Sequence, residues 1–354
     1  MLETTIVLEA ASAEKGADEV MLGAAHALRK LRRPLDLHLV VYDDADTDSP
    51  AGNELTAAAR ATGTSVAFHQ ASDRLPNNIE SPVKVYRNYP NNPINVAFRQ
   101  YKETGGAVIS PGNTGLVMTC ALFELGRLPG ISRPPIATPW PTKRKSMFIL
   151  DSGANVDVRP AHLHQFAHIG RVYVSRVFRR ENPRIGLLSN GSEDYKGSHL
   201  VREAHKLLAE DSAINFVGHV EGQNLLDGDV DVLLCDGFLG NILLKFAEGL
   251  ASTLGSALRE EVTRNPFSAL AAGLLFRGSL ARFKKRFDYS EWGGAPLLGV
   301  KGNVVICHGR SEANAIKNAM VWATRMVDED VSRSIEEEVR QANVIADNGP
   351  ALAP

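Results

Sequence analysis

The chain has 354 residues, of which 44% are hydrophobic, and this is enough for a large α/β fold with a sizeable core. Its 39 basic and 41 acidic residues are interspersed and give a net charge of -2, so no overall field recruits nucleic acid. The three cysteines lie in separate apolar segments and cannot all pair, which favours a reducing compartment and predicts a cytoplasmic protein. We find no signal-peptide pattern at the N-terminus and no apolar stretch long enough to span a bilayer.

Short apolar runs alternate along the chain with Gly- or Asn-rich turns and amphipathic stretches. This pattern predicts βα units and an α/β fold with a mainly parallel sheet, its helices filling the intervals between strands. The predicted strands are Thr5–Leu8, Leu37–Tyr42, Ala107–Ser110, Met147–Leu150, Ile185–Leu188, Ile214–Val217, Val230–Cys235 and Val304–Cys307.

The segment 129–142 carries five prolines, which exclude a regular helix and disfavour a central strand. We interpret it as a rigid crossover that could join two lobes. We assign residues 1–345, which include this segment, to one domain, and residues 346–354 to a flexible tail.

Ligands of open parallel sheets bind beyond the carboxyl ends of the strands, so the turns after the apolar runs are the candidates for function. In the turn 110–115, Asn113, Thr114 and Gly115 open a helix whose free N–H groups suit an anion such as phosphate, although such turns often only cap a helix. In the turn 151–155, an acid and Asn155 could orient a substrate, or could simply bond their own backbone.

Three further turns bring charged or amide side chains to the same edge. Lys196 follows one strand, at a place where an ammonium could meet a phosphate dianion, although most lysines are only solvated. The next turn contains Asp236 and Gly240 and leads into a helix on which Asn241 and Lys245, four residues apart, share a face. The last turn supplies His308, Arg310 and Ser311. Together these turns predict an anion-binding cleft without naming a reaction.

Three histidines, His162, His164 and His168, lie in one predicted helix. His164 and His168 share a face at metal-ligand spacing, but the helix offers no acidic third ligand. We therefore predict no metal site there, and none at the cysteines, which lack a CxxC spacing.

Seven segments carry a resemblance to a known family. They are SPGNTG (110–115), GISRPPIATPWPT (130–142), LDSGANVDVRPAHLHQFAHIG (150–170), PRIGLLSNGSEDYKG (183–197), NFVGHVEG (215–222), DVDVLLCDGFLGNILLKFAEG (229–249) and DYSEWGGAPLLGVKGNVVICHGRSEANAIKNA (288–319). In this order they resemble PlsX, the acyl-carrier-protein:phosphate acyltransferases of bacterial phospholipid synthesis. The resemblance implies a Rossmann-like α/β/α fold, similar to that of isocitrate and isopropylmalate dehydrogenases, and a homodimer.

The N-terminal region departs from the family pattern. Glu9-Ala10-Ala11-Ser12-Ala13-Glu14 stands where the family usually has Asp-Ala-Met-Gly-Gly-Asp, and a basic run followed by Asp-Ser-Ser is replaced by VKVYRNYPNNP at 83–93. Three alternatives thus stay open beside the PlsX reaction: a paralogue with an altered donor, a transferase that uses coenzyme A as phosphotransacetylases do, and a non-catalytic protein that binds acyl carrier protein or acyl phosphate.

The resemblance also implies a chemistry without cofactors, in which acyl carrier protein and inorganic phosphate give acyl phosphate. On this interpretation Lys196 and the helix start at 113–115 hold phosphate, and Asn241 stabilises the oxyanion. His308 protonates the departing sulfur or hydrogen-bonds the phosphate, and Asp236 orients one of the cations of the site. We expect Asn155, Gly240 and Ser311 to contact substrate.

The stretch 265–287 combines apolar residues with a basic cluster. This composition suits either a buried helix or an amphipathic hairpin on an anionic membrane surface, and we favour the hairpin. The product would then pass to a PlsY-type membrane glycerol-3-phosphate acyltransferase, at the inner face of the cell membrane.

Overall fold

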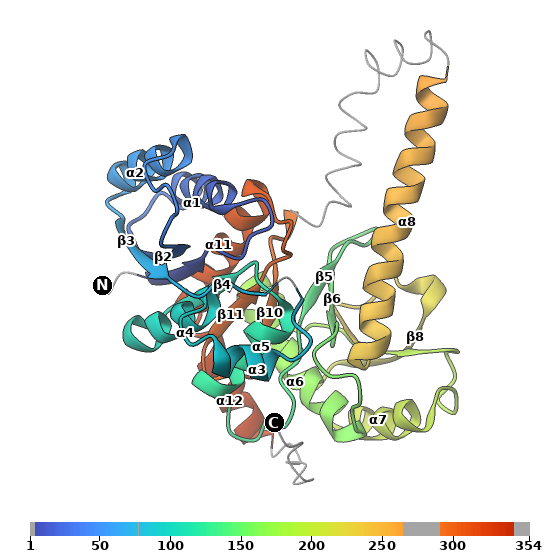
Figure 1. The fold of residues 1–354 in the computed structure, drawn as a ribbon. Coiled ribbons are helices and arrows are strands. Elements are labelled where there is room, and N and C mark those ends of the chain that lie inside the picture. Colours follow the sequence, from blue (N-terminus) through green and yellow to red (C-terminus); the bar gives the residue numbers. More distant parts are fainter. Residues whose placement is uncertain (1–3, 77, 265–290, 343–354) are drawn as a thin grey trace.

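The computed structural model describes residues 4–76, 78–264 and 291–342 (Figure 1). The strands are β1 (Thr4–Glu9), β2 (Leu35–Tyr42), β3 (Ser65–Ala71), β4 (Ala107–Ser110), β5 (Thr138–Trp140), β6 (Met147–Leu150), β7 (Ile185–Ser189), β8 (Phe216–Glu221), β9 (Val232–Leu234), β10 (Ala295–Leu297) and β11 (Asn303–Ile306). The helices are α1 (Ala17–Leu31), α2 (Pro50–Thr62), α3 (Pro82–Asn88), α4 (Pro93–Thr104), α5 (Thr114–Glu124), α6 (Pro160–Phe178), α7 (His199–Glu210), α8 (Gly237–Thr263), α11 (Ala313–Asp328) and α12 (Val331–Gln341), with a short 3-10 helix, η1 (Gly222–Asn224).

The strands form two sheets, each mainly parallel with one antiparallel edge strand. Sheet 1 has the order β10-β11-β4-β1-β2-β3, and sheet 2 has the order β5-β6-β9-β7-β8. The antiparallel strands are β10 in sheet 1 and β5 in sheet 2. This arrangement confirms the predicted α/β class.

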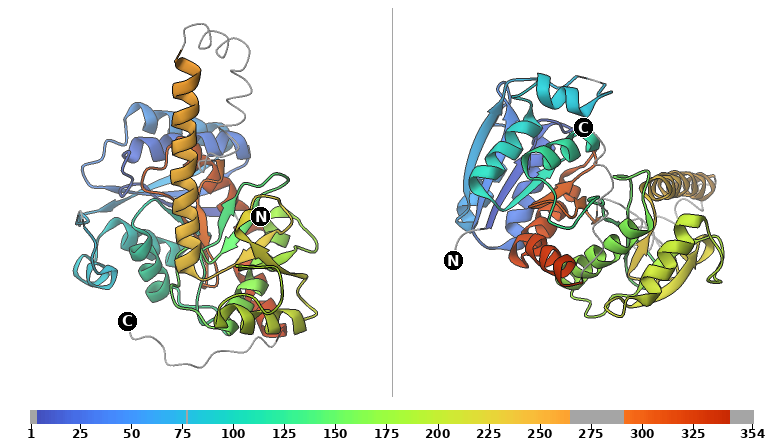
Figure 2. Two further views of the ribbon diagram at one scale, coloured as in Figure 1. Left: turned by 90° about the vertical axis from the view of Figure 1, so that its right-hand side faces the viewer. Right: turned by 90° about the horizontal axis from the view of Figure 1, so that it is seen from below.

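Helices cover both faces of sheet 1, because its strands are apolar on both sides. In β1, Ile6 and Leu8 pack with α1, α2 and α11, whereas Val7 between them packs with α4 and α5 on the opposite face (Figures 1 and 2). All three side chains are completely buried. The continuous apolar runs that predicted buried parallel strands are explained by this sandwich.

Sheet 2 is covered by α6 and α7 on one face and by the first turns of α8 on the other. Helix α8 has 27 residues and extends well beyond the sheet, as Figures 1 and 2 show. Helix α12 packs on α6 and so joins the C-terminal part of the chain to sheet 2.

The proline-rich segment 129–142 runs between the sheets. Ile136 forms an antiparallel bridge with Leu297 of β10, and Leu298 N donates to Pro135 O over 2.9 Å. Its one strand, β5, contains Pro139 and lies at the edge of sheet 2, where a missing N–H costs least.

The predicted strands all occur, with small differences at their ends. The largest is β8, which begins at Phe216 and runs to Glu221 instead of covering 214–217. Three strands, β3, β5 and β10, were not predicted: β3 is a partly exposed edge strand, and the other two have three residues each, so none has a long apolar run.

Candidate active site at the strand ends

The turns of sheet 1 are fixed by the buried carboxyl group of Glu9, the last residue of β1. Its Oε2 accepts a hydrogen bond from Ser110 Oγ over 2.8 Å, and its Oε1 accepts one from Ser12 N over 2.7 Å. Gly112 N in turn donates to Ser110 Oγ over 3.0 Å. Glu9 is fully buried, and this desolvation raises its pKa. Glu9 therefore holds the turn that leads into α5.

Helix α5 begins at Thr114 with Asn113 as its cap. Asn113 Oδ1 accepts from Leu116 N over 3.0 Å, so the side chain has the capping role that was the alternative to ligand binding. The first N–H groups of a helix have no partner inside it, which leaves those of Thr114 and Gly115 directed beyond its start. The phosphate role of this turn stays a prediction and rests on the backbone rather than on the Asn113 amide.

The turn after β11 is joined to the altered turn after β1. Glu14 N donates to Gly309 O over 2.9 Å, and Arg310 Nε lies 3.2 Å from Glu14 Oε2. His308 is exposed and its Nδ1 accepts from Arg310 N over 3.1 Å, whereas the Ser311 hydroxyl is buried and has no hydrogen-bond partner in the described part of the chain. Thus Arg310 forms an ion pair with Glu14, the last residue of the altered turn.

In sheet 2 the turn after β6 is organised by Asp151. Its completely buried carboxylate accepts from the backbone N–H groups of Ile136, Gly153 and Ala154 on Oδ1, and from both N and Nδ2 of Asn155 on Oδ2. Asn155 Nδ2 also donates to Pro134 O over 2.9 Å. The Asn155 amide thus holds the turn together, which was the alternative to its predicted contact with substrate.

The start of α8 lies directly on this turn. Asp236 caps the helix by accepting from Leu239 N over 2.8 Å, and Gly237 N donates to Asn155 O over 2.8 Å. A Cβ added to Gly240 would lie 1.9 Å from Asp151 O, so only glycine permits this approach. No cation within ion-pair distance of Asp236 is found among the described residues, and its predicted role in orienting a cation stays a prediction.

Asn241 and Lys196 differ from these side chains because they have no such partners. Asn241 is half-buried beside Gly153, where an added Cβ would lie 3.6 Å from Asn241 Cβ, and it makes no hydrogen bond within the described residues. Lys196 follows β7, which neighbours β9; its ammonium lies 5.6 Å from the centre of the Tyr195 ring and forms no ion pair within 4.0 Å in the described chain. An amide and an ammonium are therefore available at the ends of adjacent strands.

The predicted site residues fall into two groups. Asn155, Asp236, Gly240 and Asn241 contact one another or the same turn in sheet 2, and Lys196 follows the next strand. The other group, which lies at the ends of β4 and β11 in sheet 1, consists of Asn113, Thr114, Gly115, His308 and Ser311.

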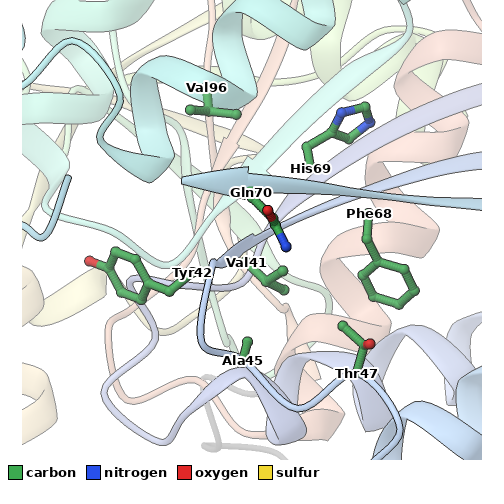
Figure 3. A pocket seen from close by; sticks show the side chains of 8 residues that line it. All are labelled: Val41, Tyr42, Ala45, Thr47, Phe68, His69, Gln70 and Val96. Carbon is green, nitrogen blue, oxygen red and sulfur yellow. The ribbon is translucent and has the colours of Figure 1, made fainter. Parts of the chain in front are cut away.

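A cavity of about 440 Å³ lies beside β2 and β3 (Figure 3). It contains none of the predicted site residues. The side chains that line it are Val41, Tyr42, Ala45, Thr47, Phe68, His69, Gln70 and Val96.

Two carboxyl groups shape the site: Glu9, whose role the sequence analysis missed, and Asp151, which bonds its own turn, the alternative to its predicted role in orienting a substrate. Each ends an apolar strand run, and a charged residue in that position is the signal that could have indicated a buried, hydrogen-bonded carboxyl group. The oxygens of both carboxyl groups accept hydrogen bonds from the turns, so both groups act by positioning those turns.

The fold and the two sets of strand-end turns define an α/β protein with polar turns at the carboxyl ends of its parallel strands. The sequence model of the family described as "Fatty acid synthesis protein" matches residues 4–334. A phosphate acyltransferase of Syntrophotalea carbinolica is 40% identical over 341 residues, covering 96% of this chain and 94% of the relative. A phosphate acyltransferase of Thermosynechococcus vestitus is 40% identical over 357 residues, covering 98% of each chain. This chain belongs to the phosphate acyltransferase family, which confirms the resemblance to PlsX and extends it to the N-terminal region.

Solved structures agree with this assignment at the level of the fold. A phosphotransacetylase from Streptococcus pyogenes matches with a TM-score of 0.58 at 15% identity, over 92% of this chain and 94% of that chain. A branched-chain phosphotransacylase from Enterococcus faecalis matches with a TM-score of 0.54 at 14% identity, over 92% and 99% of the two chains. In the part of the chain that the structure describes, we find no helix both long and apolar enough to cross a membrane.

Proposed function

We propose that the chain transfers an acyl group from acyl carrier protein to inorganic phosphate and releases acyl phosphate. Family membership over nearly the whole chain sets the reaction class. The single structural observation that carries the site assignment is the pairing pattern. Most polar side chains of the turns are bonded within the protein, whereas the Asn241 amide and the Lys196 ammonium have no hydrogen-bond or ion-pair partner among the described residues.

In this mechanism a phosphate oxygen attacks the thioester carbonyl. The phosphate lies on the free N–H groups at the start of α5 and is paired with Lys196, while Asn241 donates to the oxyanion that forms on the carbonyl. The C–S bond then breaks, and the proton that the attacking hydrogen phosphate brings passes to the departing sulfur, giving acyl phosphate and free thiol. His308, whose Nδ1 accepts from Arg310 N, donates a hydrogen bond from Nε2–H to the departing sulfur or to the phosphate. No acyl-enzyme is needed, because phosphate is the nucleophile and the thiolate is a competent leaving group.

The experiment that tests the function measures free thiol released from acyl-acyl carrier protein and from acyl-coenzyme A, with and without phosphate. Hydroxylamine traps the acyl phosphate. We expect phosphate-dependent release from the carrier protein. Release from coenzyme A alone would indicate an altered donor, and no release by folded protein from either donor would leave only a binding role.

Replacement of Lys196 by Ala tests the phosphate site. A charge-assisted hydrogen bond contributes about 1.5–3 kcal/mol, so the KM for phosphate is expected to rise about 10- to 100-fold. Lys206→Ala is the matched control, because Lys206 is exposed and its ion pair is with Glu203 on the same helix. Unchanged turnover and KM in the Lys196 variant would remove its assigned role.

We further propose that the enzyme is a homodimer, with α8 in the interface. Five exposed apolar side chains recur every fourth residue along α8 and form a stripe that a second copy could cover: Phe238, Ile242, Phe246, Leu250 and Leu254. Light scattering measures the oligomeric state of the wild type and of Phe246→Glu. We expect the wild type to be a dimer and the variant to dimerise more weakly, and a monomeric wild type would contradict the proposal.

Contact with the inner face of the membrane also remains a proposal. The predicted hairpin at 265–287 lies outside the described residues. Flotation with anionic and neutral vesicles tests it, because a basic amphipathic segment is expected to bind only the anionic vesicles.

A further inference from the structure

A cluster of four side chains, one buried and three largely buried, joins three helices outside the strand-end turns. His164 and His168 lie on α6, Asp211 directly follows α7, and Glu338 lies on α12. The His168 side chain is 0% exposed, and the other three are between 12% and 17% exposed. The cluster therefore belongs to the interior of the protein rather than to a solvated surface.

Two imidazoles and one carboxylate converge in this cluster. His164 Nε2 lies 2.7 Å from Asp211 Oδ2, and His168 Nε2 lies 2.9 Å from the same oxygen. The three ligand atoms all lie within 4.8 Å of one another. Asp211 supplies the acidic third ligand whose absence from α6 was the reason to predict no metal.

These atoms are close to the arrangement that a tetrahedral zinc ion requires. Zinc binds imidazole nitrogen and carboxylate oxygen at about 2.0–2.2 Å, which places neighbouring ligand atoms about 3.3 Å apart. The two N···O distances are shorter than this by about 0.5 Å, and the two imidazole nitrogens lie within 4.8 Å of each other. An outward shift of the Asp211 carboxylate, together with closer approach of the two rings, would admit the ion.

Glu338 provides the support that metal-bound histidines commonly have. Its Oε1 lies 2.8 Å from His168 Nδ1, and Arg171 pairs with its other oxygen. A carboxylate that accepts from Nδ1–H orients the ring so that Nε2 faces the metal. His168 Nδ1 is thus used by Glu338, and His168 Nε2, which faces His164 and Asp211, is the nitrogen that can bind a metal.

We propose that His164 Nε2, His168 Nε2 and Asp211 Oδ2 bind a divalent transition-metal ion, with zinc as the best match. Water occupies the fourth position, on the side where His164 and Asp211 are partly exposed. The ion cross-links α6 to the connection between α7 and β8, and through Glu338 it stabilises the contact with α12. Its role is structural, since none of its ligands belongs to the proposed active site.

The test uses full-length protein without an affinity tag, dialysed against EDTA and then titrated with Zn²⁺ by calorimetry. Co²⁺ serves as a second probe, because a tetrahedral site gives it visible absorption. We expect one ion per chain and a Tm that rises by roughly 2–4 °C at a Zn²⁺ concentration of 100 Kd. No binding of either ion, or no visible Co²⁺ band, would overturn the proposal.

Variants separate this site from adventitious binding. Asp211→Asn and His164→Gln are each expected to weaken Zn²⁺ binding at least about 100-fold, and Glu338→Gln about 10- to 100-fold. If Asp211→Asn does not fold, His164→Gln provides the same test. His205→Gln is the control, because His205 belongs to a separate histidine pair, with His219 at 3.1 Å. Binding that survives the first two changes but is lost with His205→Gln would place the ion elsewhere and refute the assignment.

Discussion

Replacement of Asp151 by Asn is expected to destabilise the protein more than an Asp→Asn replacement at any exposed position. Both carboxylate oxygens of Asp151 accept hydrogen bonds: three backbone N–H groups point at Oδ1, and the N and Nδ2 of Asn155 point at Oδ2. An amide has only one acceptor oxygen, so two donors of Asn155 would face an NH₂ group. The opposite orientation of the amide is worse, because three donors would then be unpaired.

The magnitude follows from the two lost acceptor contacts. A buried donor left without a partner costs about 1–3 kcal/mol, and this loss is partly offset because a neutral amide is cheaper to bury than a carboxylate. We therefore expect the free energy of unfolding to fall by about 3 kcal/mol. Since α8 starts on this turn, Asn241 should also lose its position and kcat should fall.

Urea unfolding followed by circular dichroism measures the change. Asp157→Asn is the matched control: Asp157 is exposed in the same loop, and its change should stay within about 0.5 kcal/mol. Equal midpoints for the two variants would show that the hydrogen bonds to Asp151 do not hold the turn, and the reasoning would be wrong.

Three further changes test the site. Asn241→Ala should lower kcat about 10²- to 10³-fold with little change in KM, as expected when one oxyanion donor is lost. Steady-state kinetics measure this, with Gln223→Ala at an exposed position as the control, and an effect on KM alone would refute the role of Asn241. Gly240→Ala places a Cβ 1.9 Å from Asp151 O and should lower the free energy of unfolding, measured with urea, by about 1–3 kcal/mol. Gly255→Ala, on the same helix, places its Cβ in open space and should not lower it. Equal stabilities for these two would contradict the close packing. Glu9→Gln should change stability in a pH-dependent way, because burial raises the folded-state pKa of Glu9 and makes its ionisation unfavourable in the folded protein. Relative to the wild type, the variant should gain stability as the pH rises from about 4 to about 8, and the opposite trend in urea unfolding would refute this.

The sequence predicted the strands that are buried on both faces. The runs that became β1, β4, β6 and β11 are continuous and apolar because helices cover both sides of them. Edge strand β3 alternates and is partly exposed, so its pattern carried no such signal. The turns after the strands were also recognised, since glycine, asparagine and aspartate mark them locally.

The sequence could not show which side chains of those turns remain available. Asn113, Asn155 and Asp236 were candidates of the same kind as Asn241, yet their polar groups are used by caps and turns. That distinction depends on neighbours brought in by folding.

By itself the sequence determined the α/β class, the strand-end turns and the family, because these depend on local residue patterns and on motif order. Only the tertiary structure decided the division into two sheets, the contact of Glu9 with Ser110 across 101 positions, and the meeting of His164 and His168 with Asp211. These contacts join residues far apart in the chain, and no local pattern specifies them, since they form only when separate elements pack around a shared core.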